Sequence, residues 1–188
     1  MTACRSARTQ RQVGFTLVEL MVVVVITGIL AIIGVSIMRS FAYSSKATEA
    51  SASIQAIRAA QERWRAETLS YLRVSGSMTS WYPNPTPAVA GTITLKYAWD
   101  NPGGNDKPAW DLLNPSIPGP VQYGYVTWAG APTQLPPAFS TATQPAWQVP
   151  TQPWYVIEAI CNANGDGVMA HMAASSFTDE LYTENSGE

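Results

Sequence analysis

The chain has 188 residues, of which 46% are hydrophobic, and its mean hydropathy of −0.01 is that of an ordinary globular protein. Its 11 basic residues against 13 acidic ones give a formal net charge of −2, which argues against a protein that holds nucleic-acid backbones by excess positive charge. Two cysteines, Cys4 and Cys161, are too few for a disulfide framework, and the length suffices for one domain with a sizeable core.

The N-terminal region departs sharply from these averages. Residues 1–13 contain three arginines and no acid, and no residue from Leu20 to Met38 is charged. A helix of that length spans roughly 28 Å, close to the hydrocarbon thickness of a bilayer. A basic head followed by an apolar span predicts membrane insertion with the arginines left in the cytoplasm.

Two simple interpretations of this region are a cleaved secretory signal, with Ser40-Phe41-Ala42 as the cleavage site, and a plain signal anchor. Neither explains Glu19, which directly precedes the apolar span. A carboxylate at this position costs a few kcal/mol to insert into a membrane, so it needs a partner.

The segment Gly14-Phe15-Thr16-Leu17-Val18-Glu19-Leu20 resembles the class III signal of type IV pilins and pseudopilins, and the resemblance continues through residues 22–30. It implies that the prepilin peptidase cuts between Gly14 and Phe15, on the cytoplasmic side, and then methylates the new amino terminus of Phe15. The apolar helix would therefore be retained after processing.

Glu19 would become the fifth residue of the processed chain. The resemblance implies that its carboxylate neutralises the amino terminus of a neighbouring subunit during assembly. Such a pair is physically reasonable, because opposite charges attract strongly at low dielectric and an unpaired one is costly. Ser36 stands where many family members carry a proline, and a serine can bend a helix slightly by bonding to a carbonyl one turn earlier.

The chain is expected to have four parts. Residues 1–14 are the leader, 15–38 the transmembrane or fibre-core half of a long helix, 39–72 its amphipathic half, and 73–188 a globular β-sheet domain with proline-rich loops. All 14 prolines lie in this last part.

Apolar residues at spacings of three and four mark one stripe of the amphipathic half. On its other surface Arg58 precedes Glu62, and Arg63 precedes Glu67, by one helical turn. These are read as ion pairs on a solvated face.

Strand-like patterns follow at residues 92–99, 121–128, 154–161 and 168–177, the last extended by Leu181-Tyr182. One helical turn is expected at 109–113. A helix followed by consecutive strands predicts an α+β fold in which an antiparallel sheet packs on the helix, which is also the architecture that the pilin resemblance implies.

Few residues suggest chemistry. Asn162–Gly167 begins like a calcium loop, but Ala173 stands where a bidentate acid is needed, so a plain turn is favoured over a metal site. Cys161 and His171 could form a nucleophilic pair, yet nothing orients them, and a buried cysteine with a surface histidine is expected. No catalytic residue, metal or cofactor is therefore assigned.

The seven tryptophans are expected mainly in the core. Trp81 and Trp147 lie in proline-flanked loops and could instead be exposed for adhesion or subunit contact. Loss of the leader removes three arginines and leaves the processed chain with a net charge of −5, which makes DNA binding still less favoured.

These patterns predict a structural subunit of a type IV pilus, either a pilin or a minor pilin, which polymerises through its N-terminal helix. Two alternatives are a pseudopilin of a type II secretion system and an adhesive minor pilin at the fibre tip. A membrane-anchored periplasmic enzyme is a third class, for which the sequence offers no polar constellation.

The expected partners are the prepilin peptidase, other pilin subunits in a homo- or heteropolymer, and inner-membrane lipid before assembly, with no nucleic acid. The chain would first lie in the inner membrane and then in an extracellular pilus or a periplasmic pseudopilus.

Overall fold

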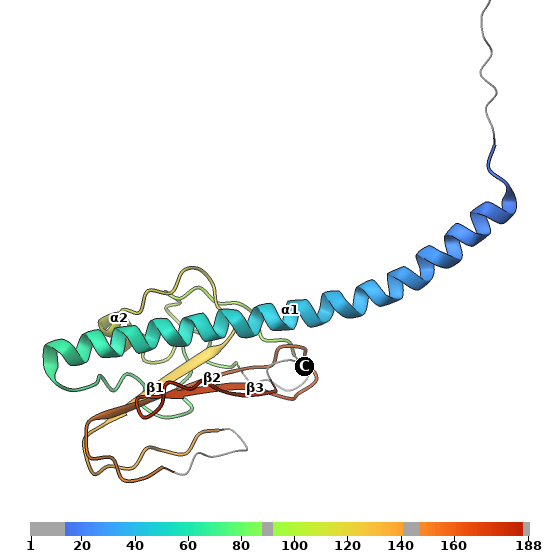
Figure 1. Cartoon of the computed structure of the whole chain (residues 1–188). Helices are drawn as coiled ribbons and strands as arrows, with labels where there is room; N and C mark the ends of the chain where they lie inside the picture. The colour runs from blue at the N-terminus through green and yellow to red at the C-terminus, as the bar shows by residue number, and fades with distance from the viewer. Residues whose placement is uncertain (1–13, 88–91, 141–146, 186–188) are drawn as a thin grey trace, which may run out of the picture. The chain divides into compact units, whose positions relative to one another are not determined.

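The computed structural model describes residues 14–87, 92–140 and 147–185 (Figure 1). It divides into two compact units, Met1–Arg39 and Ser40–Glu188, which are described separately. The leader before Gly14 lies outside the described residues. The bend expected from Ser36 concerns a side chain that is also outside the described part.

The helix α1 (Leu17–Thr68) contributes to both units. It ends because Leu69 adopts a left-handed conformation with φ of 61°, while its N–H still donates to the Arg65 carbonyl at 2.8 Å. The buried Gln61 side chain then fixes the departing chain, since its amide bonds both the N–H and the carbonyl of Leu72. The helix therefore stops four residues before the expected end at Leu72.

The remaining elements are a short helix, α2 (Lys107–Leu113), and a sheet of four antiparallel strands in the spatial order β1-β2-β3-β4. The strands are β1 (Gly124–Gly130), β2 (Trp154–Cys161), β3 (Ala170–Ser175) and β4 (Tyr182–Glu184). The expected α+β class, a helix with an antiparallel sheet, is confirmed.

The part of α1 in the second unit packs on one face of this sheet, as Figure 1 shows. Residues spaced by three and four along the helix are fully or almost fully buried there: Ala50, Ile54, Ile57 and Ala60. They meet alternate residues of β2: Tyr155, Ile157, Ala159 and Cys161. Complete burial of each isoleucine contributes about 1.5–3 kcal/mol to folding.

The opposite face of the sheet is also covered, because every residue of β2 is buried. Much of the cover comes from residues 131–140 and 147–153, which we call the strap and which Figure 1 draws in orange on the side of the sheet away from α1. Its Phe139 packs on Trp154 and Val156 in a second, smaller core. The sheet is therefore the middle of three layers.

Most of the expected strands are present with small shifts. Residues 154–161 form β2 as expected, and β3 and β4 lie within the last predicted region or next to it. β1 begins at Gly124 rather than at residue 121, because the two residues before Tyr123 are engaged elsewhere. Val121 bonds to Tyr97, and the Gln122 N–H donates to Glu49.

The strand expected at residues 92–99 is wrong. Tyr97 does exchange two backbone hydrogen bonds of 2.8 Å with Val121, but Thr94 donates to the carbonyl of Asn162. Since the two ends of the segment bond to different partners, no continuous ladder forms.

The idea that Trp81 is exposed for recognition is also wrong. Only 7% of Trp81 is exposed, and it packs against Val126 and Ile160 on the strap side of the sheet. Trp147 is half-buried and contacts Phe139. These tryptophans therefore contribute to the cover of the sheet.

Candidate functional site

The candidate site is the start of α1 in the first unit. Thr16 caps the helix, since its Oγ1 accepts the N–H of Glu19 at 3.2 Å and its carbonyl accepts the N–H of Leu20 at 3.2 Å. Glu19 thus stands at the third helical position, where the partial positive charge of the helix N-terminus stabilises a carboxylate.

The helix beyond Glu19 presents apolar surface on all sides. By length and composition, Leu17–Val35 is able to cross a membrane, and none of it is buried within the chain. Thr27, the one hydroxyl in this stretch, donates to the carbonyls of Val23 and Val24 at 2.8 and 3.1 Å. The span therefore carries no unsatisfied side-chain donor that would oppose entry into lipid.

The residues expected at the processing site lie next to this helix start. Gly14 and Phe15 precede the Thr16 cap without regular structure, and Phe15 is 78% exposed. A side chain added at Gly14 would meet no described atom within 4 Å. A backbone that lies outside regular structure and is exposed next to a small residue is open to a peptidase.

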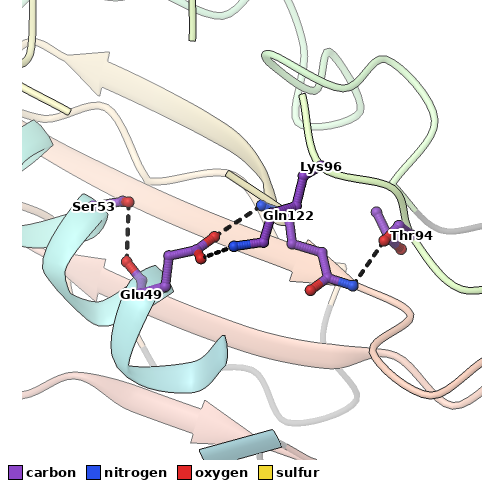
Figure 2. A network of polar contacts seen from close by, with 5 residues as sticks. All are labelled: Glu49, Ser53, Thr94, Lys96 and Gln122. Carbon is purple, nitrogen blue, oxygen red and sulfur yellow. Dashed lines mark hydrogen bonds and ion pairs between the residues drawn. The ribbon is translucent and has the colours of Figure 1, made fainter. Parts of the chain in front are cut away.

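In the second unit, a polar network fastens α1 to the loops beside the sheet (Figure 2). Glu49 forms an ion pair with Lys96 and accepts the N–H of Gln122 at 3.0 Å. The Gln122 amide in turn donates to the carbonyl of Thr94 at 2.7 Å. The network ties one turn of the helix to two segments that are distant in sequence.

Two arginines of α1 bind backbone carbonyls of two other segments of this unit. The guanidinium of Arg58 donates to four carbonyls between 3.0 and 3.3 Å, those of Ser175, Thr178, Asp179 and Glu180. Arg63 donates to the carbonyls of Leu113 and Asn114 after α2. The ion pairs expected for these arginines are therefore wrong, because each guanidinium donates to backbone carbonyls instead, although Glu62 and Glu67 are exposed as expected.

The loop at Asn162–Gly167 uses its oxygens internally. Asn162 Oδ1 accepts the N–H of Gly165, and Asp166 Oδ1 accepts the N–H of Val168 at 2.7 Å. The Asn164 amide donates to the second Asp166 oxygen at 2.7 Å. These contacts hold the loop as a turn, and the described residues contain no group of three or more His, Cys, Asp or Glu side chains placed to hold a metal ion.

Cys161 and His171 do not form a nucleophilic pair. Cys161 faces α1, whereas His171 lies opposite Ile160 on the strap side of the sheet. Burial raises the pKa of the Cys161 thiol to about 11, so the thiol is neutral near pH 7. His171 is only 9% exposed, which makes the expectation of a surface histidine wrong.

His171 instead lies near a buried acid that sequence reasoning missed. Glu158 is fully buried and accepts both the N–H and the hydroxyl of Ser140 through Oε1, while His171 Nδ1 lies 3.5 Å from the same oxygen. The carboxylate, and not the imidazole, touches the serine hydroxyl. The order of groups is thus unlike that of a hydrolase triad, in which histidine contacts the serine.

Comparisons with known proteins also point to the N-terminal segment. Residues 10–35 match the family model described as the prokaryotic N-terminal methylation motif. A stretch of 77 residues is 38% identical to the type II secretion system core protein G of Pseudomonas aeruginosa PAO1, and covers 41% of this chain and 54% of that protein. The chain thus spans about half the length of this relative. No solved structure gives a significant match.

Proposed function

We propose that the chain is a structural subunit of the pilin and pseudopilin type that polymerises through α1; its N-terminal methylation motif and its similarity to core protein G support this. It is held in the inner membrane by Leu17–Val35, cut between Gly14 and Phe15 by the prepilin peptidase, and methylated on Phe15. Glu19 then pairs with the amino terminus of a neighbouring subunit.

The observation that carries this proposal is the exposed state of the apolar helix. None of the span Leu17–Val35 is buried within the chain, so its side chains need cover from lipid or from other subunits. The same surface can serve both states in turn, because moving a helix from lipid to a bundle of like helices exposes no apolar area to water.

The Glu19 carboxylate favours the transfer of the helix from lipid to the assembled fibre. In the isolated subunit its charge is stabilised by the first turn of its own helix, through the Thr16 cap and the aligned peptide dipoles. A neighbour's free amino terminus adds a full positive charge at low dielectric, which is a much stronger partner. Assembly in register is thereby favoured over sliding of the apolar helices.

Two fibres remain as candidates for the assembled state. The similarity to core protein G favours a pseudopilin of a type II secretion system. The type IV pilus subunit, major or minor, is the second candidate. Deleting the gene distinguishes them: a pseudopilin is required for release of exoproteins into the medium, whereas a pilus subunit is required for surface fibres.

The test of the assembly mechanism is Glu19→Ala in the full chain, expressed in its host. We expect normal membrane insertion and normal cleavage, because the apolar span and Gly14 are unchanged. Incorporation into sheared or cross-linked fibres should fall at least about tenfold, since one buried positive charge per contact loses its partner and each 1.4 kcal/mol is a factor of ten.

The matched control is Glu67→Ala, which removes an exposed acid near the end of α1. Mass spectrometry of the processed N-terminus reports cleavage and methylation independently of assembly. If Glu19→Ala enters fibres at the level of the Glu67→Ala control, the role given to Glu19 is wrong. If the native chain keeps residues 1–14 in cells that contain the peptidase, the processing proposal fails.

A further inference from the structure

One end of the second unit carries exposed apolar side chains on two loops. Ile93 and Leu95 lie on one loop, and Val168 follows the turn at residues 162–167. Thr94 is buried between Ile93 and Leu95, so these two side chains point to the same outer side of their loop. A single exposed apolar side chain is ordinary on a protein surface, whereas a group of them marks a contact surface.

Direct contacts hold the two loops side by side. The Thr94 N–H donates to the carbonyl of Asn162 at 2.9 Å, and the Thr94 hydroxyl accepts the N–H of Asn162 at 2.8 Å. Ile93 lies against Gly165, since a Cβ added at that glycine would lie 3.0 Å from the Ile93 side chain. The exposed apolar residues of both loops therefore form one surface, which we call the base patch: Ile93, Leu95 and Val168.

The base patch is fastened to α1 close to the membrane span. Lys46 donates to the carbonyl of Ala163, in the turn, at 2.8 Å, and Lys96 pairs with Glu49 (Figure 2). Lys46 follows Met38, the end of the uncharged run, by eight residues, which span at most roughly 12 Å as helix. A headgroup layer adds roughly 5–8 Å to each side of the hydrocarbon core. The tether therefore keeps the base patch near the headgroups.

The charges next to the base patch balance one another. Lys46 and Lys96 are matched by Glu49 and the exposed Asp166, whereas the chain as a whole is acidic. An anionic leaflet repels an acidic surface but attracts an exposed lysine such as Lys96, whose long stem can lie along apolar side chains. Apolar side chains flanked by lysines are typical of surfaces that lie in the membrane interface.

We propose that the base patch inserts into the headgroup layer of the bilayer that holds the same chain. This rests on the membrane-held state in the function proposed above. Because α1 tethers the patch to the bilayer, the contact is intramolecular, and a few partly buried side chains suffice to maintain it. A tilt of about 20°, which is usual for membrane helices, brings one side of the unit towards the headgroups. The contact limits how the unit turns about the axis of α1.

The experiment places a fluorescent label on the base patch of the full chain. The chain is reconstituted in vesicles of phosphatidylethanolamine and phosphatidylglycerol at a low protein-to-lipid ratio. The label is attached to Leu95→Cys in a Cys4→Ser background, while the buried Cys161 stays unlabelled. A lipid that carries a nitroxide on its headgroup quenches the label only where the two come into contact.

Leu112→Cys is the matched control for the label position. Leu112 is 58% exposed, against 69% for Leu95, but it lies on α2. Arg63 binds the end of α2 through the carbonyl of Leu113, seventeen residues and roughly 25 Å of helix beyond Lys46. We expect headgroup quenching of the label at residue 95 and its loss at residue 112.

A further variant tests the apolar contact itself. With the label at residue 95, Ile93→Ser together with Val168→Ser should weaken the contact at least about tenfold, because two apolar side chains no longer leave water. Quenching should then fall to the level of the Leu112→Cys control, and unchanged quenching in this variant would overturn the proposal. Circular dichroism checks the fold. Should the variant fail to fold, the comparison of residues 95 and 112 still decides.

Vesicle flotation in alkaline carbonate separates this proposal from the proposed function. A chain that does not float with the lipid is not held by α1, which refutes both. A chain that floats but shows equal quenching at residues 95 and 112 refutes the base patch alone. Shielding of the label only at a high protein-to-lipid ratio, without headgroup quenching, assigns the patch to a second copy of the chain and also overturns the proposal.

Discussion

Arg58 holds the segment between β3 and β4 against α1, and replacing it should measurably lower the free energy of unfolding. Its guanidinium donates to four carbonyls between residues 175 and 180, a segment that joins β3 to β4. The described chain has one cysteine, the buried Cys161, and so no internal disulfide ties this segment down. Sheet pairing of the three-residue β4 and the contacts of Arg58 are left to hold it.

The size of the effect can be worked out from these contacts. A hydrogen bond to a charged donor contributes about 1.5–3 kcal/mol when buried, but three of the four here are exposed and compete with water. We therefore expect Arg58→Ala to cost about 2 kcal/mol in total. For a chain of this length that corresponds to a drop in Tm of about 4–8 °C.

The assay is thermal unfolding of the full chain in detergent by circular dichroism, together with limited proteolysis. Cleavage within residues 176–185 should be faster in Arg58→Ala. Arg58→Lys should recover only part of the stability, because an ammonium lacks the planar fork that reaches several carbonyls at once. Arg65→Ala, which loses one hydrogen bond and a cation–π contact, both to Tyr71, is the matched control. An unchanged Tm and an unchanged proteolysis rate in Arg58→Ala would refute this reasoning.

Two further predictions concern ionisable groups in the core. The Cys161 thiol, with a pKa raised to about 11 by burial, should resist alkylation at pH 8 in the native chain and react once the chain is unfolded, as measured by mass spectrometry; rapid native labelling would contradict its burial. Burial raises the pKa of Tyr82 to about 12, with Asp111 and Asp100 as smaller causes. Because unfolded tyrosine ionises near pH 10, the unfolded state loses that proton first, and stability should fall as the pH rises from 10 to 12. Denaturant unfolding at those pH values checks this, and Tyr82→Phe should show a shallower fall than the native chain.

The candidate site was largely predictable from sequence because it depends on local pattern. Gly14, Phe15 and Glu19 occur in one short motif, and the apolar span after them needs no tertiary contact to be recognised. The Thr16 cap was also readable, since a threonine three residues before a glutamate is a capping-box pattern.

The globular unit was predictable only where its pattern is simple. β2 is an apolar run, interrupted by Glu158, between prolines and a turn, and its bounds follow from that. By contrast, the polar groups that join distant segments, such as Arg58 with residues 175–180, leave no trace in local spacing. The i,i+4 spacing of Arg58 and Glu62 predicts an ion pair, but the Arg58 guanidinium donates instead to backbone carbonyls that are distant in sequence.

The same limit explains the errors on the strap side of the sheet. The expectation of a surface histidine at His171 is wrong because the strap buries this face of the sheet. Proline-rich segments have no periodicity that reveals whether they cover something. Only the uninterrupted burial of β2 indicates that both of its faces are dry.

The three-layer arrangement also limits how this subunit can meet others. α1 closes one face of the described sheet and the strap closes the other, while residues 75–82 bond to the free edge of β1 through Thr127 and Tyr125. The remaining edge, β4, is three residues long and ends at Glu184, a short and charged edge of the kind that resists strand addition. Growth by β-strand pairing, which leads to irreversible aggregates, is thereby discouraged. If the chain is a membrane-held subunit, as proposed above, these closed edges keep neighbouring copies from pairing through their sheets.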